Sequence, residues 1–464
     1  MIPPGAPIVT AEQMRAAEEA VFRHVPQQDV MERAGAAVAR EAARFALDRP
    51  ILVLAGPGNN GGDAYAAARL LKARGHDVML AASSAPGPSA AAAMHAQWDG
   101  PVTALYEARP RPFLIDGLFG TGLTRPLERG VAPVLAELVA AAEFTLAIDL
   151  PSGIATDSGN DLGAPRGISA TLALGALKPG HLIGAGLEKC GAVLLADIGI
   201  QVATQWRTLS RPRLAAPGAY SHKYSRGMVV VVQGDMPGAA RLAARAAMAG
   251  GAGYVVLAGL HGDSAGPDAL VHRRVDSGED LGELLADDRI GAVVVGPGLG
   301  RDRRAEGFLK AALNSDRPLV LDGDALTLLG TSTSAWLQRR SASAWLTPHG
   351  GEFARIFAGD GSKIDQSIAL AAESRATVIN KGADTVIASP RGAVRVLANA
   401  SPWLSTAGTG DVLAGLVAAQ VATGNKAAAE GAVWLHACAA RRAGPGFVAD
   451  GLIDHIPGAL SECL

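Results

Sequence analysis

Short apolar runs separated by helix-length, alanine-rich stretches recur through the first half of the chain. The runs are Ile51–Ala55, Asp77–Ala82, Phe113–Asp116, Phe144–Asp149, Ala170–Leu174 and Ala192–Ala196. Continuous apolar runs of this length, with such segments between them, are typical of buried parallel strands joined by crossover helices. The segment from Thr10 to Ala46 is rich in Ala, Glu, Arg and Met and predicts two helices that lead into the sheet.

The pattern stops between Gln205 and Arg226, where Pro, Gly and polar residues predict a linker. A second alternating series then begins, with runs at Met228–Gln233, Tyr254–Ala258, Ala292–Gly296, Pro318–Leu321, Trp345–Thr347, Thr377–Asn380 and Thr385–Ala388. A chain of 464 residues also exceeds one ordinary hydrophobic core. We therefore expect two three-layer αβα domains, residues 1–212 and 213–464.

Composition and charge narrow the possible partners. The chain is 49% hydrophobic and 19% charged, which is typical of a globular protein. The net charge of −2, without a long basic block, argues against nucleic acid as a partner. Three widely spaced cysteines match no metal spacing and indicate reduced thiols. Neither a membrane span nor a signal peptide is recognisable, so we expect a soluble cytoplasmic protein. We also expect a homo-oligomer.

A glycine-rich turn, Gly56–Asp63, follows the first predicted strand, and a helix is expected to begin near Ala64. A strand, a glycine-rich turn and a helix in this order point backbone N–H groups at an anion. The alternative is a tight turn with Asp63 as the helix cap. The adjacent pair Asn59 and Asn60 inside the turn favours the anion site.

Acidic residues end two further predicted strands. Asp116 is followed by the loop Gly117–Pro126, and Asp149 is followed by Leu150–Gly153. Each aspartate alone would be read as a cap or turn residue. Because the carboxyl ends of parallel strands face the ligand crevice, we expect both to converge there with Asp63. Three such acids beside glycines indicate a binding site.

With these motifs, residues 10 to 200 resemble the NAD(P)H-hydrate epimerase family. The matching segments are Gly58–Asp63, Gly120–Leu123, Asp149–Gly153 and Ala176–Gly180. The resemblance implies a Rossmann-like fold, a bound potassium ion and exchange of the R and S forms of hydrated NADH or NADPH. One departure is Ala64, which stands where the family commonly has glycine; a methyl group facing the site would narrow the approach to the phosphates.

The same resemblance implies roles for individual residues. Asp149 is the implied acid/base residue, and Asn60, Asp116 and Ser152 are the implied potassium ligands. The implied substrate-binding residues are Asn59, Asn60, Gly61, Gly62, Asp63, Gly120, Thr121, Gly122, Leu123, Thr124, Arg125 and Pro126.

The second half carries Gly408-Thr409-Gly410-Asp411 ahead of an alanine-rich helix, expected from Val412 to about Thr423. Such a motif places N–H groups where negative charge develops, with a carboxylate beside them as a general base. The alternative is a glycine loop with an aspartate cap. Alone, the motif indicates only the ribokinase-like superfamily of small-molecule kinases.

Four more segments lie at the ends of predicted strands: Gly296–Gly300, Asp322–Ala325, Thr347–Glu352 and Lys381–Thr385. His349 presents an imidazole that donates or accepts near neutral pH, or else is merely structural. Lys381–Thr385 suits a nucleotide phosphate or ribose, and in isolation would be an ordinary hairpin.

Together with Ser221–Tyr224 and Gly234–Ala240, these segments make residues 215 to 464 resemble the ADP- or ATP-dependent NAD(P)H-hydrate dehydratase family. The resemblance implies a ribokinase-like fold and removal of water from the S hydrate while the nucleotide loses its terminal phosphate. Mg²⁺ is expected with the nucleotide. The family usually has proline where this chain has Gly350.

The residues implied to contact the hydrated dinucleotide are Ala239, Gly300, His349 and Asp411, and those implied to contact ADP are Lys381, Gly382, Ala383, Asp384, Thr385 and Gly410. Phosphorylation would turn the poor hydroxide leaving group of the hydrate into a good one. Asp411 would deprotonate the substrate hydroxyl, while N–H groups of Gly408–Gly410 stabilise the transferring phosphoryl group.

Two alternatives stay open from the sequence. A vitamin-precursor or sugar kinase with an accessory binding domain would use the same Asp411 device, and only the fused first half disfavours it. A scaffold whose first domain binds a partner without catalysis would not need Asn60, Asp116, Asp149 and Ser152 together.

Overall fold

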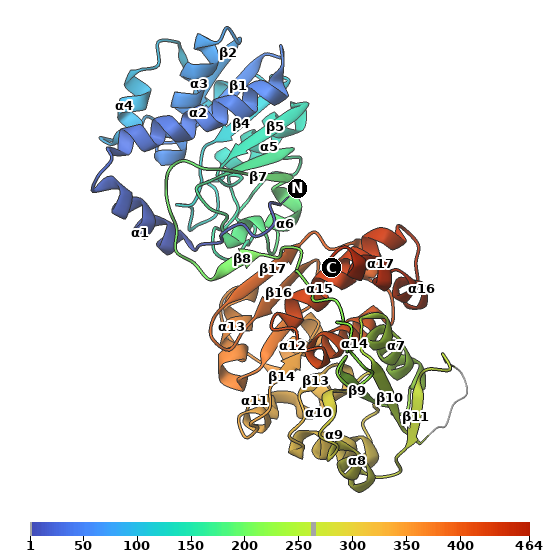
Figure 1. Cartoon of the computed structure of the whole chain (residues 1–464). Helices are drawn as coiled ribbons and strands as arrows, with labels where there is room; N and C mark the ends of the chain where they lie inside the picture. Colours follow the sequence, from blue (N-terminus) through green and yellow to red (C-terminus); the bar gives the residue numbers. More distant parts are fainter. Residues whose placement is uncertain (1, 261–265) are drawn as a thin grey trace. The chain divides into compact units, whose positions relative to one another are not determined.

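A computed structural model describes residues 2–260 and 266–464 of the chain. The chain divides into two compact units, Met1–Thr208 and Leu209–Leu464. In Figure 1 the first unit runs from blue to green and the second from green to red. Each unit has a mainly parallel sheet with helices on both faces, which confirms the predicted α/β fold class.

The first unit is built on a parallel sheet with the strand order β3-β2-β1-β4-β5-β6-β7. Its strands are β1 (Ile51–Ala55), β2 (Val78–Ala82), β3 (Val102–Ala104), β4 (Phe113–Gly117), β5 (Phe144–Ile148), β6 (Ala170–Leu174) and β7 (Ala192–Ala196). This is the strand order of the doubly wound Rossmann sheet. The strands are parallel, but successive strands are added toward one edge up to β3 and toward the other edge from β4 on, so the order switches between β1 and β4. The carboxyl ends of β1 and β4 therefore border the crevice in which such folds bind ligands.

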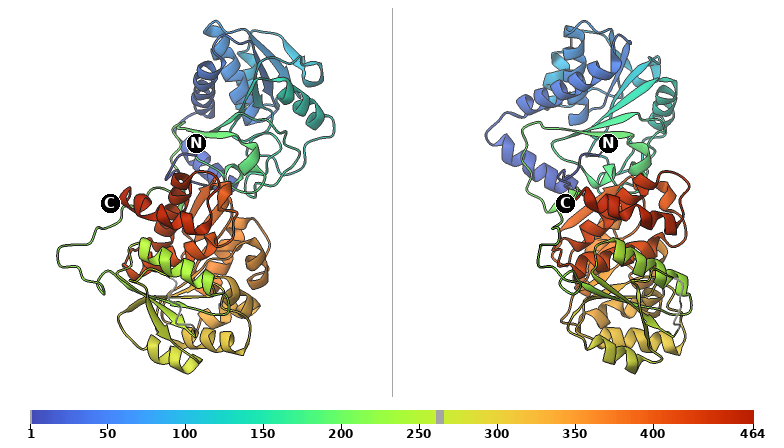
Figure 2. Two further views of the ribbon diagram at one scale, coloured as in Figure 1. Left: turned by 90° about the vertical axis from the view of Figure 1, so that its right-hand side faces the viewer. Right: turned by 45° about the vertical axis from the view of Figure 1, so that its right-hand side comes forward.

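Alternate side chains of a strand point to opposite faces of the sheet, and both faces of this sheet are buried under helices. In β1, Ile51 and Val53 pack on one face, and Leu52 and Leu54 on the other. Helices α2 (Gln27–Ala46), α3 (Asn59–Ala73) and α4 (Ala90–Ala96) cover the first face, and α5 (Val131–Ala141) covers the second (Figure 2). The predicted three layers are thus present.

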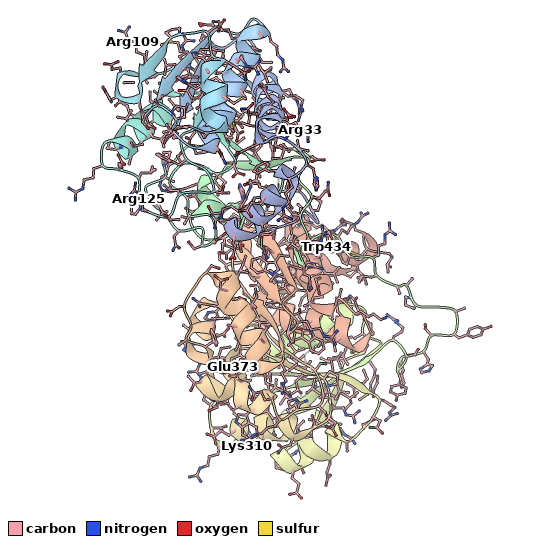
Figure 3. The ribbon with its side chains drawn as sticks, turned by 90° about the vertical axis from the view of Figure 1, so that its left-hand side faces the viewer. Arg33, Arg109, Arg125, Lys310, Glu373 and Trp434 are labelled. Atoms are coloured by element: carbon pink, nitrogen blue, oxygen red, sulfur yellow. The ribbon has the colours of Figure 1, made fainter. Side chains whose placement is uncertain are left out.

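Polar residues mark the outside of this unit. The exposed Arg33 on α2 and the exposed Arg109 are both labelled in Figure 3. The two helices predicted ahead of the sheet are α1 (Ala11–Phe22) and α2. The short α6 (Gly186–Lys189) lies between β6 and β7, and the short β8 (Trp206–Thr208) follows the sheet; there the Ile8 N–H donates to the Trp206 carbonyl at 2.9 Å.

The helix after the glycine-rich turn begins at Asn59, so the predicted start near Ala64 is wrong. Gly58, in an extended conformation, is the N-cap, and Asp63 therefore lies inside the helix rather than at its cap. A Cβ on Gly61 would lie 1.8 Å from the Gly56 carbonyl oxygen, so this turn closes only with glycine there. Ala64 is fully buried, and its Cβ faces Gly117 of β4 rather than the crevice.

The second unit has a sheet whose strands follow the order β11-β10-β9-β12-β13-β14-β15-β16-β17, with β9 third from one edge. The strands are β9 (Met228–Val232), β10 (Tyr254–Gly259), β11 (Val271–Arg274), β12 (Ile290–Val295), β13 (Leu319–Leu321), β14 (Ala344–Leu346), β15 (Thr377–Asn380), β16 (Asp384–Ala388) and β17 (Val394–Ala398). Pairing is parallel as far as β15, and β16 and β17 are antiparallel additions. The order in which successive strands are added to the sheet switches between β9 and β12, and such a switch point marks the ligand crevice.

Two sets of helices sandwich this sheet. One face carries α7 (Pro237–Ala249), α14 (Thr409–Ala422), α15 (Ala428–Ala443), α16 (Ala449–Asp454) and α17 (Ile456–Ser461). The other carries α8 (Gly278–Leu285), α9 (Arg303–Asn314), α10 (Gly323–Leu329), α11 (Thr333–Leu337), α12 (Gly350–Ile356) and α13 (Lys363–Ser374).

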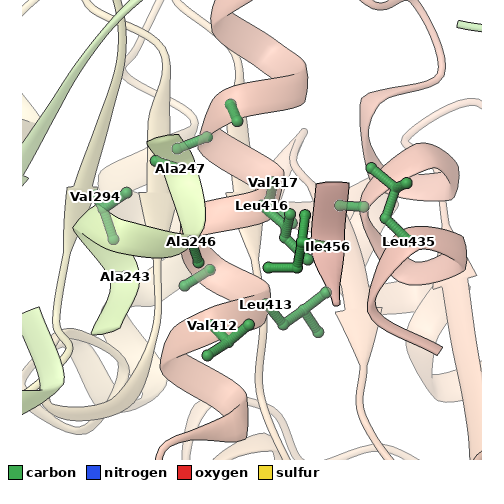
Figure 4. Close-up of a cluster of buried hydrophobic side chains, with 14 of the residues drawn as sticks. Ala243, Ala246, Ala247, Val294, Val412, Leu413, Leu416, Val417, Leu435 and Ile456 are labelled. Carbon is green, nitrogen blue, oxygen red and sulfur yellow. The ribbon is translucent and has the colours of Figure 1, made fainter. Parts of the chain in front are cut away.

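Small residues let α7 and α14 approach each other closely. Figure 4 shows Ala243 and Ala246 of α7 beside Val412 and Leu416 of α14. A Cβ on Gly415 would lie 2.0 Å from the Ala243 carbonyl oxygen. The helix α14, which carries Asp411 in its first turn, is therefore packed closely in the core.

Candidate active sites

The first unit contains a cavity of about 440 Å³ at the carboxyl ends of its central strands. Of the residues predicted for the site, Asn59, Asn60, Asp63, Gly120, Thr121, Gly122, Leu123, Thr124, Arg125 and Asp149 line it. Gly61 and Gly62 do not, because they face Gly56 and Met31, respectively. Pro126 is also outside the lining, while Arg125 is exposed at the rim (Figure 3).

Asp149 forms a buried ion pair that sequence reasoning missed. It follows β5 with a φ of 60°, and its Oδ1 accepts hydrogen bonds from the Leu174 N–H at 3.1 Å and from Lys178 Nζ. The Lys178 side chain is 1% exposed and also lines the cavity. Its only sequence signal was its place in the matching segment Ala176–Gly180, which predicted no role for it.

Two further acids face the same cavity. Burial raises the pKa of Asp63 well above its usual range, the charges of Asp149 and Glu18 raise it further, and Lys178 opposes them. Burial also raises the pKa of Glu18, against the lowering effect of Lys178. Glu18 was missed because it lies on α1, ahead of every predicted strand-end motif. The cavity therefore combines two acids of raised pKa with the ion pair of Asp149 and Lys178.

The three predicted potassium ligands meet at one loop. The fully buried Asp116 accepts from the Ser152 N–H at 2.9 Å and from Ser152 Oγ at 2.7 Å, and Ser152 Oγ accepts from the Phe119 N–H at 2.9 Å. Burial raises the pKa of Asp116, and its bonds from Ser152 lower it. Asn60 adjoins the next residue of this loop, since a Cβ on Gly120 would lie 2.9 Å from Asn60 Oδ1.

These groups suit a hard cation, which prefers carboxylate, hydroxyl and amide oxygens. The buried Asn60 Nδ2 has no hydrogen-bond partner within the described part of the chain, and the oxygen of this amide, Oδ1, is the atom that suits a cation. Residues 2–260 and 266–464 contain no cluster of three His, Cys, Asp or Glu side chains of the kind that holds a transition metal.

In the second unit, Asp411 lies in the first turn of α14, whose N-cap is Gly408 with a φ of 89°. The helix therefore begins three residues before the predicted Val412, and Thr409 and Gly410 belong to its first turn. A Cβ on Gly410 would lie 3.1 Å from Lys381 Nζ and 3.9 Å from Asp322 Oδ2. The helix start, with its free N–H groups, thus faces a lysine and a second acid.

Lys381 and three acids form a coupled cluster. Lys381 Nζ donates to Asp322 Oδ1 at 2.7 Å and lies 3.8 Å from Glu352 Oε2. Burial lowers the pKa of Lys381, but the charges of Asp322, Glu352 and Asp411 outweigh this and raise it. Burial raises the pKa of Asp411 to about 6, helped by Asp322 and opposed by Lys381. Asp411 is therefore tuned for proton transfer near neutral pH.

Beside this cluster lies a cavity of about 390 Å³ with one polar and one apolar wall. The predicted residues that line it are His349, Lys381, Gly382, Ala383, Thr385 and Gly410. Leu397, Leu404, Leu413 and Val433 supply apolar surface opposite them. Asp384 does not line the cavity, because its carboxylate pairs with Lys363 at 2.6 Å. The size and lining suit a nucleotide base and sugar.

Ala239 and Gly300 lie outside that cavity, where the loops after β9 and β12 meet. A Cβ on Gly298 would lie 3.1 Å from Ala239 Cβ, and Gly300, with a φ of 84°, donates its N–H to Asp324 Oδ2 at 3.0 Å. His349 caps α12: its Nδ1 accepts from the Gly351 N–H at 3.0 Å. Gly350 is the first residue of α12, with no atom within 4 Å of a Cβ built on it.

Each of the two α/β units has a cavity at its strand ends and a buried lysine among acids, so the fold defines a two-domain protein with one candidate active site in each unit. A family model described as NAD(P)H-hydrate dehydratase matches residues 229–456, and one described as YjeF-related protein N-terminus matches residues 27–180. No helix among the described residues is long and apolar enough to cross a membrane.

Full-length relatives carry both parts. The bifunctional NAD(P)H-hydrate repair enzyme of Gloeobacter violaceus is 36% identical over 478 residues, covering 93% of this chain and 92% of the relative. That of Salinibacter ruber is 32% identical over 523 residues, covering 98% and 96%. The chain therefore belongs to the family of bifunctional NAD(P)H-hydrate repair enzymes.

Among solved structures, the ADP/ATP-dependent NAD(P)H-hydrate dehydratase of Bacillus subtilis, co-crystallised with ATP/Mg²⁺, is 27% identical, with a TM-score of 0.46; the match covers 54% of this chain and 95% of that one. Membership in the repair family confirms both sequence resemblances and the expected two-activity enzyme. It also sets aside the kinase and the scaffold as alternatives. The roles of individual residues stay predictions.

Proposed function

We propose that the first unit exchanges the R and S forms of hydrated NADH or NADPH, and that the second removes water from the S form at the expense of ADP or ATP. One observation carries this division: each unit has its own cavity, with an acid beside a buried lysine. The family requires two chemistries, and the two cavities differ in the way their acids are charged.

In the first unit, Asp149 is proposed to move the proton that accompanies R–S exchange. Its Oδ1 is taken by Leu174 and Lys178, while the residue lines the cavity. Asn60, Asp116 and Ser152 would hold potassium, which, when bound, supplies positive charge next to the substrate-binding loop Gly120–Arg125. The remaining lining residues hold and orient the hydrated dinucleotide.

In the second unit, Asp411 is proposed to take the proton from the hydrate hydroxyl as that oxygen attacks the terminal phosphorus of ADP or ATP. The N–H groups at the start of α14 stabilise the phosphoryl group in transfer. The nucleotide departs as AMP or ADP. The C–O bond to the phosphorylated oxygen then breaks with release of phosphate, a better leaving group than hydroxide, and loss of a proton from the neighbouring ring carbon restores the double bond. Mg²⁺, held with the nucleotide, would neutralise phosphate charge.

Nucleotide binding is proposed for the 390 Å³ cavity. Lys381, Gly382 and Gly410 meet the phosphates, and the apolar wall meets the base. Asp384 contributes indirectly, because its pair with Lys363 holds a lysine whose Nζ also donates to the Lys381 carbonyl at 3.2 Å. Ala239, Gly300 and His349 are proposed to contact the hydrate from the opposite loops.

Separate expression of residues 1–212 and 213–464 tests this division. We expect the first fragment to interconvert R and S hydrates without nucleotide, and the second to dehydrate only S with ADP or ATP and Mg²⁺. Either activity appearing in the other fragment would contradict the proposal. The homo-oligomer and the cytoplasmic location stay predictions, measured by the mass in solution and by cell fractionation.

A further inference from the structure

A third buried residue, His181, contacts both members of the ion pair between Asp149 and Lys178. We propose that Lys178 and His181 are positioning residues for epimerisation: His181 fixes the backbone of Asp149, and Lys178 fixes its carboxylate so that one oxygen is presented to the cavity. This inference rests on the proposed epimerase function of the first unit.

The backbone of Asp149 is in the left-handed region, with a φ of 60°, which residues other than glycine adopt only when neighbouring contacts impose it. Two contacts impose it here. The Asp149 N–H donates to the Leu172 carbonyl at 2.8 Å, and the Asp149 carbonyl lies 2.5 Å from His181 Nε2. The peptide groups on both sides of Asp149 are thus fixed.

The surroundings of His181 determine which of its nitrogens carries the proton. Burial, followed by the charge of Lys178, lowers the pKa of His181 to about 4, so the ring is neutral near pH 7. The Lys178 N–H donates to His181 Nδ1 at 2.9 Å, so Nδ1 is the acceptor. The hydrogen therefore resides on Nε2, which donates it to the Asp149 carbonyl.

The carboxylate is fixed just as firmly. Oδ1 receives both the Leu174 N–H and Lys178 Nζ, and Lys178 Nζ also donates to the Leu174 carbonyl at 2.9 Å. Within residues 2–260 and 266–464, no group donates to Asp149 Oδ2. Because Asp149 lines the cavity, Oδ2 is the oxygen left for substrate.

Lys178 has an electrostatic task as well. Asp149 faces two acids, Glu18 and Asp63, and both are coupled to it by charge. The other groups around it are neutral His181 and, beyond Glu18, Arg15. Without the ammonium of Lys178, a carboxylate buried among like charges would take up a proton at higher pH.

The direct test replaces Lys178 in the full-length protein with Met, which keeps the length of the side chain but not its charge. We expect the acid limb of the pH–rate profile for R–S exchange to move up by about 1–3 pH units. The rate near pH 7 should fall, mainly in kcat. Dehydration of S hydrate by the same polypeptide should not change, because it belongs to the other unit, and a wild-type thermal unfolding transition of fragment 1–212 with the same substitution shows that the first unit is folded.

The matched control is Lys72→Met, which removes an exposed lysine paired with Asp99 at 2.8 Å in the same unit. It should leave both activities unchanged. If Lys178→Met exchanges R and S with the wild-type pH profile and kcat, the proposal is wrong. Should Lys178→Met fail to fold, Lys178→Arg decides: a retained charge must leave the acid limb in place, and a shifted limb overturns the proposal.

His181 gives an independent test, because a glutamine amide carries both a donor and an acceptor, whereas leucine has neither. We expect His181→Leu to lower kcat for R–S exchange at least tenfold with little change in KM, and His181→Gln to recover most of it. Equal kcat values for the two variants would overturn the role of His181. Dehydration by both variants should stay at the wild-type rate, because it belongs to the other unit.

Discussion

Both sites contain a buried lysine among acidic residues, and they differ in which of the acids forms the ion pair with the lysine. In the first unit, Lys178 pairs with Asp149, the proposed acid/base residue itself. In the second unit, Lys381 bonds to Asp322, and burial raises the pKa of the nearby Asp411 to about 6. The first arrangement fixes the carboxylate of the proposed acid/base residue against the charge of the lysine and orients it toward the cavity. The second leaves a carboxyl that is not bonded to the lysine and whose pKa is raised to about 6.

This difference suits two reactions. In the proposed R–S exchange, Asp149 moves a proton with a carboxylate that Lys178 holds in place. Phosphoryl transfer requires a base that removes a hydroxyl proton, together with N–H groups for the transferring phosphate. An acid bonded tightly to lysine would be a weaker base, so the partner of Lys381 is part of how the second site works.

The largest expected effect is that of Asp411→Asn. It should lower the dehydration rate by a factor on the order of 10²–10⁴, because a general base is removed without a change in shape. R–S exchange should be unchanged, since it belongs to the other unit. Rates of both reactions are measured on the same sample, and near-normal dehydration would remove Asp411 from the mechanism.

A second prediction separates the proposed potassium ligands of the first unit from its proposed acid/base residue. Asn60→Ala and Ser152→Ala should weaken ion binding, so that high potassium partly restores R–S exchange by mass action. Asp149→Ala should lose exchange at every potassium concentration, because it lacks the proton-transfer group. Titration with potassium, with sodium as the control ion, shows which variants recover. Recovery of Asp149→Ala would contradict the division of roles.

A third prediction concerns pH. Asp411 acts as a base, so it must be deprotonated, and with its pKa raised to about 6 the dehydration rate should fall below about pH 6. The expected fall is roughly tenfold per pH unit. Asp322→Asn removes a like charge and frees Lys381 for Asp411, so the limb should move to lower pH. An unmoved limb in this variant would show that another group controls it.

The smallest expected effect is that of Gly350→Pro. His349, the preceding residue, has φ −83° and ψ 169°, which a following proline accepts, and position 350 is the first of its helix. The free energy of unfolding should rise by about 0.4–1 kcal/mol, because proline restricts the unfolded chain. Denaturant unfolding measures this. A loss of stability would mean that the Gly350 N–H is needed.

The sequence predicted the parts of the molecule that depend on local pattern. The buried strands beside the crevice were predicted because their apolar runs are continuous, as in Ile51–Ala55 and Met228–Val232. Strand-end acids such as Asp116 and Asp149 were found because parallel topology brings the ends of strands together. Of the described strands, four were missed because they are short or have polar residues within them: β3, β8, β11 and β17.

Features set by contacts distant in sequence could not be predicted. The start of α3 at Asn59 depends on how closely Gly61 packs on Gly56. The pairing of Lys178 with Asp149 joins residues 29 positions apart, and no local pattern distinguishes such a lysine from a surface one. Likewise, only the fold shows that the methyl group of Ala64 faces the core and leaves the crevice open.

The most direct test of two cooperating sites uses a mixture of R and S hydrates with ADP or ATP and Mg²⁺, followed by the return of dihydronicotinamide absorbance. The wild-type chain should convert the whole mixture. Asp149→Ala should stop after the S fraction and leave R, and adding Asp411→Asn protein, with its intact first site, should restart it. Complete conversion by Asp149→Ala alone, at the wild-type rate, would contradict the account.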